Sequence, residues 1–337
     1  MKPASIKDIA ESLEVSKTLV SLVLNNKGGQ YGISPVTQQK VKAKAKELNY
    51  SPNQLAQGLR LGKSKNIGLI VPDISNPFYS KISRYIGDLI DKKGYNLTIY
   101  NTDEDIEKEK RLIKNLLERN VDGLILASTS MNNKELKELS KNKIPYVLVD
   151  RFVDGFNTNF VGVDNYQGTK EAIDYLIDKG FKRIGFISVG PDSVSSLGDR
   201  KKAYLETLKK RNISYNKDFD LMVSYNNLVE EISDKLELMF KADHKPDALF
   251  IANNKLAIES LIKLKKLNVS IPKDLSLVCF DDIPMLDILP FPVSTVAQPI
   301  QGISAEAIRI LFEEIENEGE QEFNNQQVIL SAKLIKR

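Results

Sequence analysis

The chain opens with two short stretches in which apolar residues recur with a helical period, DIAESLEV and SKTLVSLVLN, placed almost back to back. The first stretch predicts a helix over residues 6–13, because Ser5 and Asp8 stand at the spacing of a capping box. The second predicts a helix that begins after a turn at Glu14, with Ser16 as its N-cap. Two helices joined by so short a turn must cross steeply and share one small core.

A third helical pattern completes this N-terminal unit. Ser34 suits an N-cap and Pro35 the first helical position, and Val41, Ala45 and Leu48 follow at helical spacing. The three helical patterns of apolar residues predict a small tri-helical domain. Its second helix should protrude and present a short polar outer face. Such a face suits hydrogen bonds to base edges and phosphates in a DNA major groove, and a plain helical hairpin is the alternative interpretation.

Residues 51–65, SPNQLAQGLRLGKSK, carry a weaker helical pattern. Gly58 costs a helix up to about 1 kcal/mol relative to alanine, and the segment is too short to be stable alone. We therefore expect this segment to order only when a partner docks it. A mere linker is the alternative.

From residue 66 onward, apolar strand-like runs such as NIGLIV, VDGLILA, RIGFISV and LSLVCF alternate with amphipathic helical stretches. This alternation predicts parallel sheets covered by helices, and the length of the segment predicts two such units. The predicted fold class is therefore α/β, with an all-α helix-turn-helix N-terminal domain followed by two doubly wound parallel-sheet subdomains.

The distribution of charge along the chain bears on the kind of partner that the protein binds. The formal net charge of the 337 residues is +3. Residues 1–65 hold 11 Lys and Arg against 4 Asp and Glu, a net of +7, whereas residues 66–337 hold 37 against 41, a net of −4. A basic head on a mildly acidic body indicates a polyanionic partner, although a solvated lysine face gives the same count.

The sequence lacks the motifs of several other classes of protein. Cys279 and His244 are the only residues of their types, so neither an internal disulfide nor a Cys/His zinc site is expected. A phosphate-binding loop, a nucleophile elbow and a metal cluster are absent from the sequence, and we expect no cofactor and no enzymatic activity. No run reaches the ~18 apolar residues of a membrane helix and no hydrophobic signal core is present, so we expect a cytoplasmic protein.

Three motifs, SIKDIAESLEVSKTLVSLVLN, KELNYSPNQLAQGLR and IGLIVPDISNPFY, resemble the LacI/GalR family of transcription regulators, and the similarity runs over essentially the whole chain. The resemblance implies a helix-turn-helix head, a hinge helix and a periplasmic-binding-protein-like effector domain. The domains that it implies are residues 1–50 for the head, 51–65 for the hinge, 66–163 plus 292–324 for an N-subdomain, and 164–291 plus 325–337 for a C-subdomain.

The resemblance also implies which residues contact DNA. Lys17, Thr18 and Ser21 match the base-reading positions of the recognition helix, and Ser16 and Asn25 lie near phosphates. In the hinge, a leucine wedges between base pairs of the minor groove, with polar residues beside it. The hinge residues that match these roles are Leu59, Asn53, Gln57 and Arg60.

Three features of the head depart from the family pattern. Glu14 stands where a glycine is usual in the turn, which strains the turn or is accommodated there. Leu22 stands where an arginine is frequent, and is expected to contact a thymine methyl rather than a guanine. The connection NNKGGQYGIS is a few residues longer than usual. Its glycines indicate a flexible loop, from which Lys27 would contact a phosphate.

Ligands of open α/β sheets bind beyond the carboxyl ends of the strands, so polar residues at these ends are candidates for an effector site. The candidates from position and resemblance are Ser75, Asn76, Phe78, Tyr79, Ser128, Asp150, Arg151, Ser193, Arg200, Asn253, Lys255, Asp281 and Gln298. Carboxylates and amides suit the hydroxyl groups of a carbohydrate, and aromatic rings suit the apolar face of a sugar.

One departure in this set bears on the charge of the effector. Where the family usually has an Asn-Asp pair, this chain reads Asn253-Asn254-Lys255. An added ammonium near Arg151 and Arg200 indicates a positive cleft, and therefore a sugar acid or a phosphorylated sugar. The alternative is that Lys255 points to solvent and that Asn254 is a tolerated exchange.

These observations predict a sequence-specific DNA-binding repressor controlled by a small carbohydrate-type effector. We expect a homodimer that binds a pseudo-palindromic double-stranded operator, with no membrane partner. Effector binding would close the cleft and change whether hinge helices form on DNA. A cytoplasmic carbohydrate sensor that reads no operator is the alternative, whereas a solute receptor would not carry the basic head. Asp281 and Asp282 do not suggest an enzyme, since consecutive strand residues point to opposite faces.

Overall fold

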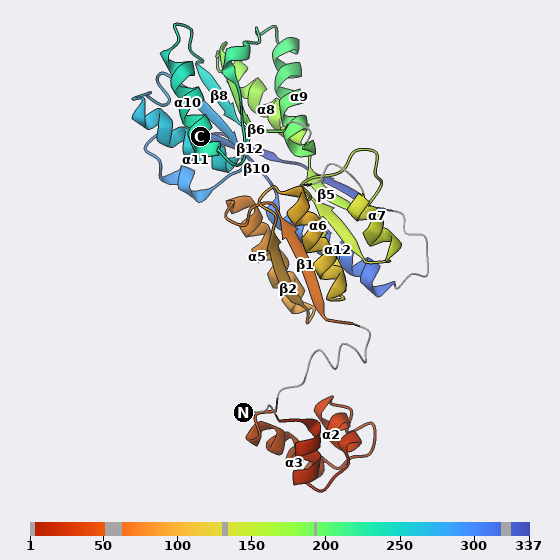
Figure 1. Cartoon of the computed structure of the whole chain (residues 1–337). Coiled ribbons are helices and arrows are strands. Elements are labelled where there is room, and N and C mark those ends of the chain that lie inside the picture. The colour runs from red at the N-terminus through yellow and green to blue at the C-terminus, as the bar shows by residue number, and fades with distance from the viewer. Residues whose placement is uncertain (1–3, 51–62, 130–133, 192–193, 318–324) are drawn as a thin grey trace. The chain divides into compact units, whose positions relative to one another are not determined.

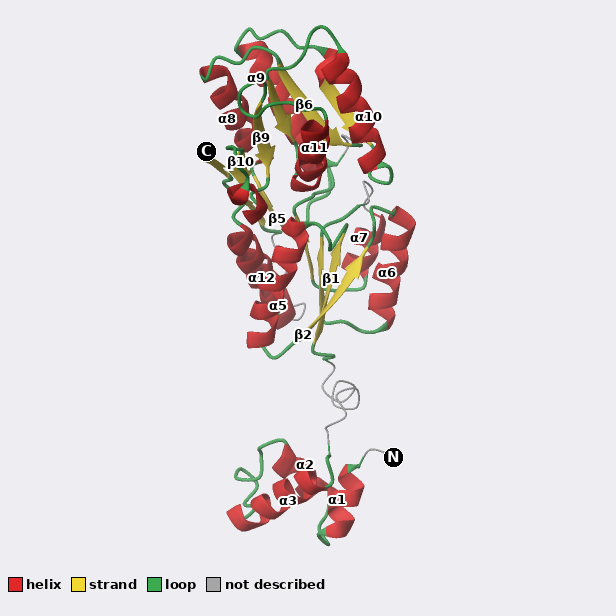
Figure 2. Ribbon diagram, turned by 90° about the vertical axis from the view of Figure 1, so that its left-hand side faces the viewer, coloured by secondary structure: helices red, strands yellow, loops and turns green. Residues whose placement is uncertain are grey.

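The computed structural model describes residues 4–50, 63–129, 134–191, 194–317 and 325–337. The chain forms two compact units, Met1–Ser64 and Lys65–Arg337, which are drawn in Figures 1 and 2. We call the first unit the head and the second the effector domain.

The head contains the three predicted helices, α1 (Ile6–Ser12), α2 (Lys17–Leu24) and α3 (Pro35–Glu47). Their N-caps are the predicted ones. Ser5 and Asp8 form the capping box, Ser16 accepts a hydrogen bond from the backbone N–H of residue 19, and Ser34 accepts one from that of residue 37. The helices meet through a small core of buried side chains, which contains Ile9, Ala10, Val20, Val23, Val41 and Ala45. The tri-helical prediction is confirmed.

The longer connection between α2 and α3 is closed by backbone hydrogen bonds. The Ile33 N–H donates to the Gly28 carbonyl at 2.9 Å, and the side-chain amide of Gln38 donates to the Ile33 carbonyl at 2.8 Å. A Cβ added at Gly28 would lie 2.8 Å from Gln38 Cδ. The loop therefore packs against α3 through the Gln38 side chain, which its glycine content alone does not indicate.

The effector domain consists of two lobes, each built on a six-stranded sheet. The strands of the first sheet, in spatial order, are β11 (Gln327–Leu330), β5 (Phe160–Val163), β4 (Tyr146–Val149), β3 (Gly123–Leu126), β1 (Asn66–Val71) and β2 (Asn96–Asn101). All neighbouring pairs in it are parallel. Helices α5 (Pro77–Lys92) and α12 (Ile300–Glu316) cover one face, and α6 (Ile106–Glu118) and α7 (Lys134–Lys141) cover the other (Figure 2).

The second lobe repeats this plan. Its strands, in spatial order, are β12 (Lys333–Ile335), β10 (Ser294–Ala297), β9 (Ser276–Phe280), β8 (Ala248–Ile251), β6 (Ile184–Val189) and β7 (Asp220–Val223). Only the pair of β10 and β12 is antiparallel among those described. The covering helices are α8 (Asn165–Asp178) and α9 (Ser195–Lys210) on one face, and α10 (Leu228–Lys241) and α11 (Asn254–Lys266) on the other.

The central strands consist mainly of apolar residues because helices bury both of their faces. Every residue of β3, β4, β6 and β8 is buried. The predicted α/β class with two parallel-dominated sheets is therefore the observed one. Two short 3-10 helices, Lys217–Phe219 and Pro284–Ile288, complete the second lobe.

The predicted boundaries of the two lobes need correction. Residues 292–324 were expected in the first lobe, but β10 pairs with β9 in the second sheet. Residues 325–337 were expected in the second lobe, but β11 pairs with β5 in the first sheet and only β12 returns to the second. The chain therefore passes between the lobes after β5, between β10 and α12, and between β11 and β12.

The strand-like run QQVILSAKLI thus divides into two strands of different sheets, because the period of a strand carries no information about which sheet it joins. Two elements were not marked by the sequence patterns above. The edge strand β7 is short and partly exposed, and α12 lies against the first sheet with apolar residues on several sides. No helix in the described parts of the chain is long and apolar enough to cross a membrane.

Candidate DNA-binding face and effector cleft

The outer face of α2 presents the polar side chains expected to meet DNA. Ser16, Lys17 and Thr18 are exposed at its N-terminal end, and Ser21 is half-buried one turn later. The Asn25 side-chain amide donates to the Ser21 carbonyl at 2.7 Å, which caps the C-terminal end of the helix. The outer face of α2 therefore has exposed hydrogen-bond donors at its N-terminal end and, in Asn25, a side chain that a hydrogen bond to the helix backbone orients.

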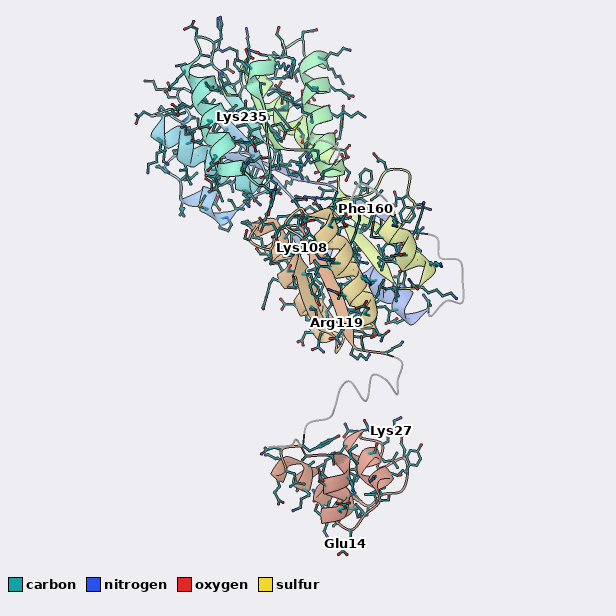
Figure 3. All side chains as sticks on the ribbon, viewed as in Figure 1. Glu14, Lys27, Lys108, Arg119, Phe160 and Lys235 are labelled. Atoms are coloured by element: carbon teal, nitrogen blue, oxygen red, sulfur yellow. The ribbon has the colours of Figure 1, made fainter. Side chains whose placement is uncertain are left out.

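Two departures from the family pattern can be placed on this head. Glu14 adopts a left-handed backbone with φ of 54°, the conformation for which a glycine is favoured, so the turn accommodates a non-glycine residue. Leu22 is half-buried, and Lys27 is exposed in the loop after α2. Figure 3 shows Glu14 and Lys27 at opposite ends of the head. The hinge candidates Asn53, Gln57, Leu59 and Arg60 lie outside the described residues.

A cleft between the two lobes of the effector domain brings together most of the predicted effector residues. Those that line it are Asn76, Phe78, Tyr79, Asp150, Arg151, Arg200, Asn253, Asp281 and Gln298. They come from the carboxyl ends of β4, β8, β9 and β10, from the N-terminal end of α5, which follows β1, and from the helix α9. The rule that ligands bind beyond the carboxyl ends of parallel strands therefore located this cleft from the sequence.

Three predicted residues do not line the cleft. Ser75 is exposed and donates to the Asp73 carboxylate at 2.5 Å. Ser128 is buried and donates to Glu109 at 2.7 Å, so it belongs to the interior of the first lobe. Lys255 lies beside the cleft and is paired with Asp73. Ser193 lies outside the described residues.

The cleft also contains residues that sequence reasoning missed, namely Asp73, Glu104, Val189, Ser196, Leu197 and Tyr225. Asp73 follows β1 and Glu104 follows β2, so the carboxyl-end rule was able to find both. Asp103, the residue beside Glu104, is exposed and pairs with Lys108, as expected for a surface residue.

Hydrogen bonds cross from one lobe to the other along this cleft. They join Lys255 Nζ to Asp73 at 2.9 Å, Asn254 Nδ2 to Asn76 Oδ1 at 3.0 Å, and the Phe152 backbone N–H to Ser195 Oγ at 3.0 Å. Although partial burial opposes it, hydrogen bonds from Ser75, Lys255 and Tyr225 lower the pKa of Asp73 to about 2. Asp73 is therefore ionised throughout the physiological range, and its ion pair connects the two lobes.

Arg151 is fixed at the wall of the cleft by carboxylates. Its Nη1 and Nη2 donate to the two carboxylate oxygens of Glu104 at 2.8 Å and 2.7 Å, and its Nε lies 3.6 Å from Asp150. The Tyr79 hydroxyl donates to Asp150 at 2.7 Å, and burial raises the pKa of this hydroxyl well above its usual range. Tyr79 therefore orients Asp150 in this arrangement, and because the residue lines the cleft, stacking of its ring on a ligand stays a prediction.

Arg200 reaches the centre of the cleft from α9. Its Nε donates to Asn165 at 2.9 Å, its Nη1 donates to the Ala252 carbonyl at 2.6 Å, and its guanidinium lies 3.5 Å from the centroid of the Phe280 ring. These contacts fix a buried cation in one orientation. Arg200 is also close enough to Asp281 and Asp150 for their charges to act on it.

Asp281 lies at the end of β9 with φ of 75°, a left-handed conformation that aspartate and asparagine tolerate. Gln298 Nε2 donates to its carboxylate at 2.6 Å. Burial raises the pKa of Asp281, against the opposing effects of Arg200 and Gln298. The Asp281 carboxyl group is therefore easier to protonate than an exposed aspartate, while Arg200 and Gln298 favour its ionised form.

Some buried polar atoms at the cleft have no hydrogen-bond partner among the described residues: Arg151 Nε, Gln298 Oε1 and Asn254 Oδ1. Buried polar atoms normally have partners, so these positions are suited to a ligand or to water. One of them is a donor and two are acceptors. Such a mixture matches hydroxyl groups, which both donate and accept.

The charges that line the cleft do not give the positive excess expected from Lys255. The lining carboxylates are Asp73, Glu104, Asp150 and Asp281, and the lining cations among the described residues are Arg151 and Arg200. Even when Lys255 is added beside them, four carboxylates face three cations. Lys255 points neither into the cleft nor freely into solvent, because it pairs with Asp73 and lies 4.8 Å from the Tyr225 ring centroid.

A helix-turn-helix head followed by a two-lobed domain with a polar cleft defines the class of ligand-responsive transcription regulators. Residues 5–53 match the model of bacterial regulatory proteins of the lacI family, and residues 173–337 match that of periplasmic binding protein-like domains. The chain is 32% identical over 312 residues to the ribose operon repressor of Halalkalibacterium halodurans, which covers 93% of this chain and 90% of that protein. This chain therefore belongs to the LacI family of transcription regulators.

Solved structures agree with this assignment. A LacI transcriptional regulator from Alkaliphilus metalliredigens, complexed with D-xylulofuranose, is 28% identical, with a TM-score of 0.67 over 81% of this chain and 98% of that one. The lac repressor dimer bound to operator and the anti-inducer ONPF has the same fold, with a TM-score of 0.85 over 100% of this chain and 98% of that one, at 22% identity.

Proposed function

We propose that this protein is a repressor whose affinity for a specific operator is controlled by a small carbohydrate bound in the cleft between the lobes. The observation that carries the proposal is the presence of two built sites in one chain. The head presents the polar face of α2, and the effector domain presents a cleft with a fixed cation and unpartnered buried polar atoms. A carbohydrate sensor without an operator would not need the first of these sites.

We infer that the effector is a neutral sugar. The neutral choice is supported by the four carboxylates near three cations, since an anionic ligand would meet a negative excess. Asp150, Asp281 and Asn253 supply side-chain oxygen and nitrogen atoms suited to hydroxyl groups. Of the similar proteins, one is a ribose operon repressor and one was solved with D-xylulofuranose, whereas the Cra regulator of Pseudomonas putida was solved with fructose 1-phosphate. The charge of the cleft, and not these names, therefore carries the neutral assignment. The sugar acid or sugar phosphate suggested by the sequence becomes an outcome of the test.

The mechanism that we propose is thermodynamic linkage. An effector that bridges Asp150 of the first lobe and Arg200 of the second stabilises one arrangement of the lobes. The chain crosses between the lobes three times, so a change in their angle is transmitted through these crossings to the segment that leads to the head. We propose that effector binding disfavours ordering of residues 51–65 on DNA and so releases the operator.

A homodimer fits this mechanism because two heads can read the two halves of a pseudo-palindromic operator. The lac repressor structure of the same fold is a dimer on its operator. In the proposed complex, Lys17, Thr18 and Ser21 read bases, Ser16, Asn25 and Lys27 lie near phosphates, and Leu22 contacts a thymine methyl. The hinge contacts proposed from the family pattern are Asn53, Gln57, Leu59 and Arg60.

The DNA-binding half of the proposal is tested by selection of duplexes from a random pool, followed by titration at several salt concentrations. We expect an enriched pseudo-palindrome whose affinity falls steeply with salt. Leu59→Ala should weaken binding to this duplex more than binding to a random duplex, since only the specific complex is expected to need the hinge wedge. A protein that enriches no sequence would instead be the sensor without an operator.

The effector half is tested by thermal unfolding with a panel of neutral sugars, sugar acids and sugar phosphates. A compound that binds the native state raises the unfolding temperature in a concentration-dependent manner. We expect neutral pentoses and hexoses to include the stabilising compounds, and we expect the same compounds to release the selected duplex. Stabilisation by the anionic compounds alone would contradict the neutral assignment.

A further inference from the structure

Two cations at the cleft, Arg151 and Lys255, are paired with the carboxylates of Glu104 and Asp73. Glu104 faces Arg151 with both oxygens, at 2.8 Å and 2.7 Å, in the bidentate geometry that guanidinium groups also use for phosphate. The Asp73 carboxylate accepts a hydrogen bond from Lys255 Nζ at 2.9 Å. Glu104, Arg151 and Asp73 line the cleft and Lys255 lies beside it, so both ion pairs border the space where an effector would be bound.

These pairings occupy the fork of Arg151. One N–H of each of its Nη groups donates to Glu104, and its buried Nε is directed toward Asp150 at 3.6 Å. Arg200 uses its Nε and one N–H of Nη1 on Asn165 and on the Ala252 carbonyl, which leaves its remaining N–H groups for a ligand. A phosphate or carboxylate needs a fork of donors and a positive field, whereas a hydroxyl needs one donor and one acceptor.

We propose that Asp73 and Glu104 are specificity-determining residues that make the cleft select neutral effectors, because they occupy the donors of Lys255 and Arg151 that would otherwise bind an anion. This inference rests on the proposed function of the cleft as the effector site. Asp73 and Glu104 are not among the effector residues predicted from the sequence. In this proposal, they disfavour the binding of phosphorylated or acidic compounds. Removal of both charges changes the balance near the cleft from four carboxylates and three cations to two carboxylates and three cations.

The test compares the binding of inorganic phosphate to the wild-type chain and to the double variant Asp73→Asn, Glu104→Gln. Isothermal titration is carried out at a constant ionic strength maintained with chloride, so that general screening is equal in all samples. We expect the double variant to bind phosphate at least about tenfold more tightly than the wild type, because two donor groups are released to a dianion.

Two further variants locate the effect. Asp103→Asn removes the same charge from the residue next to Glu104, but Asp103 pairs with Lys108 on α6 and does not line the cleft. This control should bind phosphate as the wild type does. Addition of Arg151→Met to the double variant should remove most of the gain, which places the phosphate at the Arg151 guanidinium.

The proposal is overturned if the wild type binds phosphate as tightly as the double variant, or if Asp103→Asn gains as much. Circular dichroism and urea unfolding establish whether each variant folds. If Glu104→Gln leaves Arg151 buried without its partner and prevents folding, Asp73→Asn alone remains a test, because Lys255 is 36% exposed and can be hydrated after losing its partner. A folded Asp73→Asn protein without any gain in phosphate affinity overturns the role of Asp73.

Failure of this inference and failure of the proposed function are separate results. The phosphate titration uses neither DNA nor a sugar, so it measures only the affinity of the protein for an anion. A protein that enriches no operator can still show the gain, and a repressor with a neutral effector can fail to show it.

Discussion

The side-chain ammonium of Lys255 lies 2.9 Å from the carboxylate of Asp73, which belongs to the other lobe of the effector domain. Beside this ion pair, the Asn254 amide donates to Asn76 at 3.0 Å. Side chains of the two lobes therefore contact each other directly, and these contacts contribute to the free energy that keeps the cleft closed. An ion pair with one partner 36% exposed contributes little, up to about 1 kcal/mol before screening by salt.

We predict that Lys255→Met shifts the effector-free protein toward open lobes. The radius of gyration from small-angle scattering should rise with salt for the wild type, because salt screens the pair, and should already be high and insensitive to salt for the variant. Lys241→Met is the control, since its ion pair with Glu237 lies within α10. An identical response to salt in wild type and Lys255→Met would contradict a role of this pair in closure.

A second prediction separates base reading from phosphate contact in the head. Thr18→Ala should weaken binding to the selected operator by about 1–3 kcal/mol and leave binding to random duplex nearly unchanged. Lys27→Ala should weaken both and reduce the slope of log affinity against log salt by about 1, the value for one phosphate contact. Lys241→Ala, which removes a positive charge from the effector domain, should change neither. Equal losses on both duplexes for Thr18→Ala would show that Thr18 does not read bases.

Local features of the sequence predicted those parts of the molecule that depend on neighbouring residues. Ser5, Ser16 and Ser34 cap their helices because a cap needs only the three residues that follow it. The cleft residues Asp150 and Asp281 were found because each directly follows an apolar run, and the ends of parallel strands meet at one edge.

The parts that the sequence did not predict depend on pairing between distant residues. Glu104 and Arg151 are separated by 47 positions, and Asp73 and Lys255 by 182, so no local pattern reveals that their charges cancel. The positive cleft was inferred from the cations alone for this reason. The exchange of β10 and β11 between lobes has the same origin, because the partner of a strand is decided by the packing of the whole sheet.

A third prediction concerns Asp281, whose pKa is raised by burial. A raised pKa means that the folded state binds this proton more readily than the unfolded state, so the contribution of Asp281 to stability falls as pH rises between its ordinary and its raised value. Asp281→Asn removes this dependence, and asparagine tolerates the left-handed backbone at this position.

In urea unfolding, the stability of the wild type relative to Asp281→Asn should therefore be greater at pH 4, near the ordinary pKa of an aspartate, than at pH 7.5. The same variant should lose effector affinity by about 1.5–3 kcal/mol, the contribution of a hydrogen bond to a charged group. A difference in stability that does not change between the two pH values would show that Asp281 does not titrate in this range.

The last prediction concerns the turn that brings α1 and α2 together. Glu14 has φ of 54°, where a side chain costs of the order of 1 kcal/mol and glycine costs nothing. Glycine also increases the conformational entropy of the unfolded chain, so Glu14→Gly gains in the folded state roughly what it loses through the unfolded state. We expect its effect on the stability of the head to lie within about 0.5 kcal/mol of zero.

The control is Glu11→Gly, which places the same residue inside α1 and should destabilise the head by about 1 kcal/mol. Hydrogen exchange of the buried amides of α1 and α2 in the full chain measures both. If Glu14→Gly destabilises the head as much as Glu11→Gly does, the left-handed backbone is not what distinguishes the two positions. The Glu14 side chain would then itself stabilise the turn.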